Sequence, residues 1–239
     1  MSTLQNGSLI KAFALLDLIS DQQPEITAAI VARDLDMSPA TAHRYLATLD
    51  ALGILSAQHR GVYGLGHRII HLGQIAERTN PLKKLVLPII ERLSLSLGES
   101  VMAGRPAPVG IVCMATASAP RPISVHIQVG RQLGLTSSAQ GKVWLAHQPA
   151  STLATLDDMT DALRQDLQRI RVQGFARNCG EAEPDIGAVA VPVINGSGEV
   201  ALTLSVFGMI SRFSDNRIEV MVAGLTEAAS EVATALPDV

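Results

Sequence analysis

Small, hydrogen-bonding side chains gather on one face of the stretch MSPATAHRYLATLDALGIL, residues 37–55. Ser38 can cap a helix here, Pro39 suits its first position and Gly53 can end it. At helical spacing the apolar residues share one face, and the opposite face carries Ala40, Thr41, Arg44 and Thr48. No lysine or acidic residue precedes Asp50 in this helix. This face is therefore suited to hydrogen bonding at close approach.

A second stretch whose residues could bind a ligand is LTSSAQGKVW, residues 135–144. If Ser138 starts a helix, the first main-chain amides, those of Ala139, Gln140 and Gly141, have no partner inside the helix. Such amides, together with the helix dipole, suit a carboxylate. An ordinary capped helix is the alternative interpretation. Lys142, in the first turn, is expected to be structural or exposed.

Catalytic and metal-binding patterns are not evident. Cys113 and Cys179 are the only cysteines, and their separation favours neither a zinc site nor a disulfide. His126 and His147 have no serine, cysteine or acid at a recognisable catalytic spacing, and no nucleophile elbow or phosphate loop occurs. We therefore predict no catalytic residue, no metal and no cofactor. Cys179 is expected to be a small loop residue, with a redox-sensing thiol as the alternative.

The elements around residues 37–55 indicate how this face is presented. A first helix is expected from a cap at Ser8, with Leu9 and Phe13 on its apolar face. Thr27 can cap a second, short helix over residues 28–35, and a tight turn leads to the third. Two short helices joined in this way are typical of a helix-turn-helix. Two short strand candidates, residues 54–56 and 62–65, then flank a polar turn and predict a hairpin in the position of a wing.

The rest of the chain mixes helices and strands. A helical pattern follows His67, and Asn80-Pro81 interrupts it, so we place a domain boundary near Asn80. Strands are expected over residues 109–116, 123–129, 188–194 and 200–207, and a turn at Asn195–Gly198 can join the last two into a hairpin. Helices are expected over residues 138–147, 156–173 and 215–236. The pattern indicates an α+β fold.

Composition limits the class of protein further. Of 239 residues 47% are hydrophobic and only 3% aromatic, which is ample material for an aliphatic core. We find neither a membrane-spanning run nor a signal peptide, and we expect a cytoplasmic protein without a membrane partner. Residues 1–80 hold six Lys or Arg and seven Asp or Glu, so this region lacks the basic charge of many DNA-binding domains.

The order and spacing of several motifs resemble the IclR family of bacterial transcription regulators along nearly the whole chain. The matching stretches include SPATAHRYLATLDALGIL, GVYGLGHRIIHLG, VGRQLGLTSSAQGKVWLAH and GFARNCGEAEPDIGAVAVPVINGSGEV. The resemblance implies a winged helix-turn-helix over residues 1–66, a linker helix over 67–80 and a GAF-like effector-binding domain over 81–239. It also implies a homodimer or homotetramer and a small organic effector, often an acid or an aromatic compound.

The resemblance gives the two candidate sites their roles. A helix that enters the major groove needs a small, hydrogen-bonding outer face, because its backbone must approach the base edges. The expected contacts to double-stranded operator DNA are Thr41, Arg44, Tyr45 and Thr48, with His59 and Arg60 of the wing on phosphates. The turn at residues 135–141 borders the implied effector pocket. The expected pocket residues are Ser138, Ala139, Gln140, Gly141, Asn178, Ala188, Ser205 and Phe207.

We therefore predict a ligand-responsive transcription regulator, not an enzyme, that senses a small molecule bearing a carboxylate. One alternative is a small-molecule hydrolase with an accessory helical domain, for which turnover would be lost on changing Ser138 or His147. The other is a winged-helix module that contacts proteins. The nearly neutral N-terminal region favours that alternative, and a gel shift with upstream DNA distinguishes it.

Overall fold

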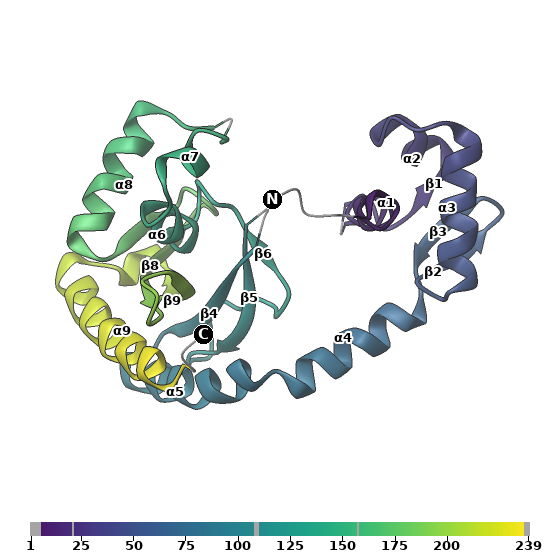
Figure 1. The fold of residues 1–239 in the computed structure, drawn as a ribbon. Helices are drawn as coiled ribbons and strands as arrows, with labels where there is room; N and C mark the ends of the chain where they lie inside the picture. Colours follow the sequence, from purple (N-terminus) through teal and green to yellow (C-terminus); the bar gives the residue numbers. More distant parts are fainter. Residues whose placement is uncertain (1–5, 21, 108–109, 157, 237–239) are drawn as a thin grey trace. The chain divides into compact units, whose positions relative to one another are not determined.

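The computed structural model describes residues 6–20, 22–107, 110–156 and 158–236. It contains two compact units, Met1–Asn80 and Pro81–Val239, and each is described by itself (Figure 1).

Three helices build the core of the first unit: α1 (Gly7–Leu16), α2 (Ala28–Asp34) and α3 (Pro39–Ala51). The Thr27 hydroxyl accepts a hydrogen bond from Ile30 N and so caps α2, and Ser38 caps α3 ahead of Pro39. Between these helices the chain turns at Asp36, whose φ is +46°. Their inward faces form one apolar cluster around Leu15, Ile26, Val31, Ala42, Leu46, Leu49 and Leu55. This arrangement is a helix-turn-helix.

The first helix differs from the prediction. Asn6, not Ser8, caps α1, because its Oδ1 accepts from the amides of Ser8 and Leu9. The expected apolar face of Leu9, Ala12, Phe13, Leu16 and Ile19 is only partly correct. Leu16 and Ile19 pack against the core cluster, but Leu9 and Phe13 are 59% and 66% exposed, and the buried residue of the helix is Leu15.

A three-stranded antiparallel sheet follows the helices, formed by β1 (Ile26–Thr27), β2 (Leu55–His59) and β3 (Val62–Leu65) in the order β1-β3-β2. The predicted hairpin is β2–β3, and Gly61 turns it with φ of +78°. At Gly66 a Cβ atom would lie 2.2 Å from the carbonyl oxygen of Gly53, so only glycine fits where the wing leads into α4 (His67–Thr79).

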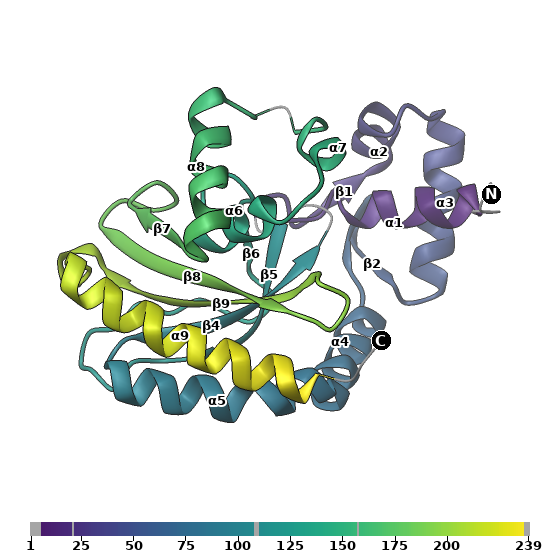
Figure 2. The same cartoon turned by 60° about the vertical axis from the view of Figure 1, so that its left-hand side comes forward.

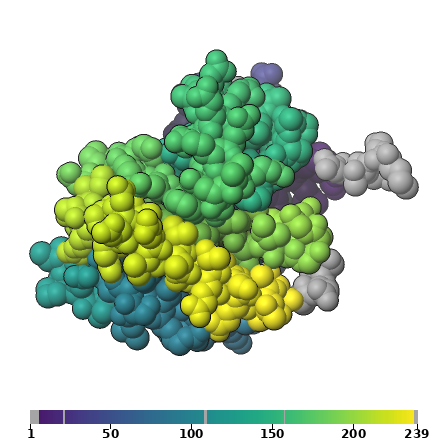
Figure 3. Space-filling view, turned by 90° about the vertical axis from the view of Figure 1, so that its left-hand side faces the viewer, coloured from purple at the N-terminus to yellow at the C-terminus, as the bar shows by residue number. Residues whose placement is uncertain are grey.

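A six-stranded antiparallel sheet forms the centre of the second unit, in the order β6-β5-β4-β9-β8-β7. Its strands are β4 (Ser100–Ala107), β5 (Gly110–Ala117), β6 (Gln132–Leu133), β7 (Ala176–Cys179), β8 (Ile186–Ile194) and β9 (Val200–Met209). Two long helices, α5 (Pro81–Leu97) and α9 (Asp215–Ala235), cover one face (Figures 1 and 2). Figure 3 shows α9 in yellow along this side of the unit, with the green segment that contains α8 above it.

The opposite face of the sheet carries α6 (Ala139–Ala146), α7 (Ala150–Leu153) and α8 (Asp161–Gln173), and the short helix η1 (Ile210–Arg212) follows β9. Side chains alternate between the two faces, as the pleat requires. On β9, Leu204 and Val206 pack in the cluster under α5 and α9. Phe207 belongs to a separate small cluster with Met102 and Cys113. The second face is therefore less completely filled by helices.

Two strand predictions need correction. Residues 123–129 are irregular rather than a strand, because Ile123 is 73% exposed and the segment is held only by isolated bonds, such as Ser100 Oγ to the carbonyl oxygen of Val125. Asn178 and Cys179, expected in a loop, belong to β7. The strand β4 was not predicted. The strand expected from residue 109 starts at Gly110, and Val109 lies outside the described residues.

Among the helices of the described segments, none combines the length and the apolar character that a membrane crossing needs. The same segments contain no cluster of three or more histidine, cysteine or acidic side chains placed to hold a metal ion.

Candidate functional site

The outer face of α3 is accessible and polar. Arg44 is exposed and makes no ion pair within the described part of the chain. Thr48 is exposed as well, and its hydroxyl donates to the carbonyl oxygen of Arg44 at 2.7 Å, which leaves its methyl group and oxygen lone pairs outward. Thr41 Oγ1 lies 2.8 Å from Ser38 Oγ at the helix start. Tyr45 packs partly against the core, so its ring is more inward than the other predicted contacts.

The wing is tied to this helix by the one acid that α3 carries. Asp50 Oδ1 accepts a hydrogen bond of 3.0 Å from the main-chain amide of Ala57 in β2. The strand pairing is irregular between Ala57 and His59. His59 and Arg60 are both exposed at the tip of the hairpin. Sequence reasoning noted Asp50 only as an acid and missed this positioning bond.

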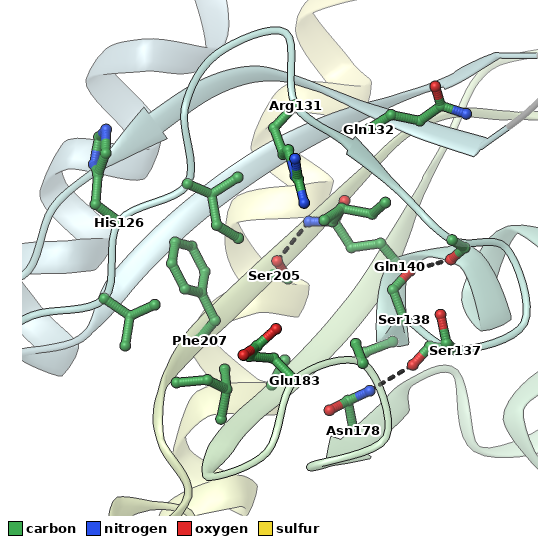
Figure 4. A pocket seen from close by; sticks show the side chains of 18 of the residues that line it. His126, Arg131, Gln132, Ser137, Ser138, Gln140, Asn178, Glu183, Ser205 and Phe207 are labelled. Atoms are coloured by element: carbon green, nitrogen blue, oxygen red, sulfur yellow. Dashed lines mark hydrogen bonds between the residues drawn. The ribbon is translucent and has the colours of Figure 1, made fainter. Parts of the chain in front are cut away.

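The second unit contains a cavity of about 550 Å³ on the face of the sheet opposite α5 and α9 (Figure 4). Four separate parts of the chain line it: residues 125–128, residues 131–140, the segment from Asn178 to Ala188, and β9. The predicted pocket residues on its wall are Ser138, Ala139, Gln140, Asn178, Ala188, Ser205 and Phe207. Gly141 is the predicted residue that the wall does not include.

At the start of α6, one of the three amides predicted to be unpaired is in use. The Ser138 hydroxyl accepts from Gly141 N at 3.0 Å and lies 2.6 Å from the carbonyl oxygen of Gly134, to which it donates. The expectation for Gly141 is therefore wrong, because the capping serine takes its amide. The amides of Ala139 and Gln140 have no hydrogen-bond partner among the described residues, and both residues lie on the cavity wall. Two donors remain there.

Gln140 anchors the base of the cavity to the sheet. Its side-chain amide donates to Ser205 Oγ at 2.5 Å, and its carbonyl oxygen accepts from Thr203 Oγ1 at 3.1 Å. Both contacts are buried, and a Cβ atom at Gly104 would lie 2.2 Å from the Gln140 oxygen. The Ser205 oxygen accepts the hydrogen bond from Gln140, so the hydroxyl proton of Ser205 is not used in this contact. Ser205 can thus act as a further donor toward the cavity.

Asn178 supports the turn that precedes α6. Its Nδ2 donates to the carbonyl oxygen of Ser137 at 2.5 Å, and its Oδ1 accepts from Gly180 N at 3.2 Å (Figure 4). The side-chain nitrogen therefore holds β7 against the turn at residues 134–138, and the side-chain oxygen fixes the residue that follows β7. The geometry adds a positioning role to the prediction of a polar pocket anchor.

Sequence reasoning missed three charged or titratable residues on the cavity wall: His126, Arg131 and Glu183 (Figure 4). They come from the irregular segment after β5 and from the connection between β7 and β8, where local patterns carry little information. Lys142 is buried and pairs with Glu181 at 2.8 Å and Asp166 at 3.6 Å. It thus joins α6 to that connection and to α8, in agreement with a structural role.

The arrangement around Ser138 and His147 gives no nucleophile and base. The Ser138 hydroxyl is engaged with main-chain groups, and His147 Nδ1 lies 2.9 Å from the carbonyl oxygen of Val143. The two residues stand at opposite ends of α6, about 13 Å apart along its axis. Burial raises the pKa of the Cys113 thiol to about 11, while Cys179 is exposed.

A winged helix-turn-helix followed by a helix and a mixed α+β unit with a ligand-sized cavity defines a class of two-domain DNA-binding transcription regulators. The IclR helix-turn-helix domain matches residues 8–59, and the C-terminal domain of bacterial transcriptional regulators of the IclR type matches residues 75–234. The chain belongs to the IclR family. Its fold is accordingly α+β, with the winged helix-turn-helix joined by a linker helix to a GAF-like effector-binding domain.

Individual relatives support this assignment. The HTH-type transcriptional regulator BhcR of Paracoccus denitrificans is 30% identical, over 94% of this chain and 85% of its own. An IclR family transcriptional regulator from Brucella abortus superimposes with a TM-score of 0.87 at 19% identity, covering 99% of this chain and 95% of its own. An IclR homologue from Microbacterium hydrocarbonoxydans, complexed with 4-hydroxybenzoate, gives a TM-score of 0.69 at 24% identity, covering 95% and 97%. The family consists of DNA-binding regulators rather than enzymes, which sets the hydrolase alternative aside.

Proposed function

We propose that this regulator reads an operator with α3 and the wing, and that a small carboxylate in the 550 Å³ cavity controls this binding. The observation that carries the ligand class is the pair of unpartnered amides at the start of α6, those of Ala139 and Gln140. Two convergent N–H donors at the positive end of a helix favour an anion. The Ser205 hydroxyl adds a third donor from the sheet.

The body of the ligand is expected to be apolar and short. The cavity wall away from α6 includes Val125, Ile127, Leu133, Ile186 and Phe207. An acid with an apolar body would place its carboxylate on the amides and its body on these side chains. The 4-hydroxybenzoate bound by the homologue from Microbacterium hydrocarbonoxydans is a compound of this type.

For operator binding we assign base contacts to Arg44 and to the Thr41 and Thr48 side chains, and phosphate contacts to Tyr45, His59 and Arg60. The exposed position of Arg44 on α3 supports its role, since arginine recognises guanine through two hydrogen bonds. The domain roles follow: residues 1–66 bind DNA, residues 67–80 link, and residues 81–239 sense the effector.

We also propose a homodimer or homotetramer assembled in part through α4. This helix buries none of its own residues, and Ile70 and Leu72 are 60% and 49% exposed. An amphipathic helix whose apolar side chains are exposed suits contact with a second copy. Light scattering should give a multiple of 25.2 kDa, and Ile70→Glu should shift it toward the monomer. A monomer that binds DNA one to one would contradict the proposal.

The ligand proposal is tested with a panel of small carboxylates and their matched amides and amines, read by calorimetry and by release of upstream DNA. The wild type should bind one or more carboxylates and none of the matched cations. Ala139→Trp should abolish the response, because the side chain fills the space before the amides, and it should leave DNA binding in place. Ala150→Trp, at an exposed position of the same unit, is the control. A best ligand that is neutral or cationic, or a normal response in Ala139→Trp, would overturn the carboxylate assignment.

A further inference from the structure

A second cavity, of about 340 Å³, lies where the C-terminal end of α5 meets the N-terminal end of α9, and none of its lining residues belongs to the first cavity. It has an unusual composition, since three of its lining side chains are arginines and only one is an acid. The lining residues are Leu97, Glu99, Arg121, Ser211, Arg212, Ser214 and Arg217.

The acid is Glu99, which is 1% exposed. Arg121 and Arg212 each place a guanidinium nitrogen 3.4 Å from one of its carboxylate oxygens. The carboxylate is closely packed on its other side, because a Cβ atom at Gly208 would lie 2.7 Å from Glu99 Oε2. The position of this carboxylate is therefore fixed between two arginines.

Two of the arginines are held in place by the last residue of α5 and the glycine that follows it. Arg217 donates to the carbonyl oxygen of Leu97 at 2.8 Å, and Arg121 donates to that of Gly98. Glu99 balances only one of the three positive charges. The first acid of α9, Asp215, pairs with Arg177 at 3.1 Å and is 86% exposed. The lining of the cavity thus keeps an excess of positive charge.

Several polar groups at this place make no hydrogen bond among the described residues. Glu99 Oε1 is buried and accepts no hydrogen bond, although a guanidinium nitrogen of Arg121 lies 3.4 Å from it. The hydroxyls of Ser211 and Ser214 make no hydrogen bond, and Ser214 does not cap the long helix α9 that it precedes. The first amides of α9 therefore add donors for an anion. A buried acceptor of this kind costs free energy unless a donor reaches it.

We propose that this cavity binds a 2-hydroxy carboxylate. The arginines, the serines and the start of α9 attract the carboxylate, but Glu99 lies within 3.4 Å of two of those arginines and would repel a simple acid. A hydroxyl on the carbon next to the carboxylate removes this conflict, because it donates to Glu99 Oε1 while the acid contacts the arginines. The positive excess favours a hydroxy acid, which is an anion, over an amino acid, which carries no net charge.

The test compares glycolate with acetate, which lacks the hydroxyl, and with glycine, by calorimetry on the full chain. Ala188→Phe, which fills the first cavity, removes binding at that site from the measurement. In this variant glycolate should still bind, about tenfold or more tighter than acetate, as expected for a hydrogen bond to a charged acceptor. Arg212→Gln should abolish glycolate binding, and Arg92→Gln, at an exposed position on α5, should not.

Two further variants keep the test decisive if Arg212→Gln does not fold. Ser214→Ala should weaken glycolate binding, and Glu99→Gln should reduce the preference for glycolate over acetate, since the charged acceptor is lost. Equal affinity for acetate, tighter binding of glycine, or loss of glycolate binding in Ala188→Phe with no effect of Ser214→Ala would overturn the proposal. A failed carboxylate response at the first cavity would leave this result unaffected.

Discussion

Helices α3 and α6 begin in the same way and serve different sites. Each starts with a serine whose hydroxyl accepts from the amide three residues later, Thr41 in α3 and Gly141 in α6. Helix α3 then presents an exposed face. Its candidate DNA contacts therefore all come from one short segment of the chain. Helix α6 is nearly all buried, and only its first turn reaches a cavity that three other parts of the chain complete.

The difference shows how solvent exposure decides what a capping serine does. Ser38 lies at the surface, where water can replace the bonds it makes. Ser138 is 6% exposed and satisfies two main-chain groups at once, the amide of Gly141 and the carbonyl of Gly134. A capping serine therefore stabilises only its own helix in α3, whereas in α6 it also fixes the turn that precedes the helix.

The largest expected effect is a loss of stability from overpacking at the buried start of α6, which has no counterpart in the exposed helix α3. Gly141→Ala should destabilise the second unit by about 3 kcal/mol, because the new Cβ would overlap main-chain oxygens. It would lie 2.3 Å from the carbonyl oxygen of Leu135 and 2.4 Å from that of Gly134. Urea unfolding followed by far-UV circular dichroism, which detects the helices of both units, measures this. Gly73→Ala in α4, where nothing lies within 4 Å of the added atom, is the control. It should be neutral or stabilising, and equal losses would refute the packing argument.

Replacing each capping serine by alanine compares the two helix starts directly. Ser138→Ala should cost about 2 kcal/mol, since it leaves two buried main-chain groups unpaired, whereas Ser38→Ala should cost about 1 kcal/mol. Hydrogen exchange resolved by mass spectrometry reports each unit separately. Equal costs at the two caps would show that burial does not distinguish them.

Arg44→Ala tests the exposed face of α3. It should weaken specific binding to upstream DNA by about 1–3 kcal/mol without changing the fold, because one bidentate contact to a base is lost. Fluorescence anisotropy at fixed salt measures the affinity. Arg33→Ala is the matched control, since the Arg33 charge is already paired with Asp34. Undiminished affinity in a folded Arg44→Ala protein would remove this residue from the recognition surface.

The smallest effect concerns the thiol beneath the cavity wall. Burial raises the pKa of Cys113 to about 11, so the folded state favours the neutral thiol, and stability should fall as the pH rises from 9 toward 11. At pH 8 and below, the thiol is largely neutral in both states and contributes little pH dependence. Urea unfolding at pH 8 and pH 10.5 measures the difference, and Cys113→Ala should reduce it. At pH 8, alkylation should modify Cys179 and spare Cys113; the reverse labelling would contradict the assigned burial.

Local patterns predicted the first unit more completely than the second. Caps at Thr27 and Ser38 and the hairpin after α3 are encoded within a few residues, so they could be identified directly. The wall of the cavity is less local. The pattern at residues 123–129 resembles a strand, yet no neighbouring strand pairs with it along its length, and β4 gave no clear signal. Arg131 and Glu183 were missed because only the tertiary fold brings their segments together.

The candidate site shows the same limit at the level of single atoms. The turn at residues 138–141 could be identified as an anion site, but the use of the Gly141 amide by Ser138 depends on side-chain geometry. Likewise, the hydrogen bond from Asn178 to the carbonyl oxygen of Ser137 joins positions 41 residues apart and cannot be inferred from spacing.

The two unpartnered donors at the start of α6 belong to the main chain, and this has a consequence for how such a sensor diversifies. A peptide N–H is present whatever residue other than proline is encoded, so point mutations seldom delete it. Partly exposed side chains of the remaining wall, such as Ala188 and Ile186, can change size by single substitutions. Under the proposed carboxylate assignment, duplicated copies of this gene can thus acquire new effectors while they retain a site for acids, and engineered biosensors can be retuned along the same route.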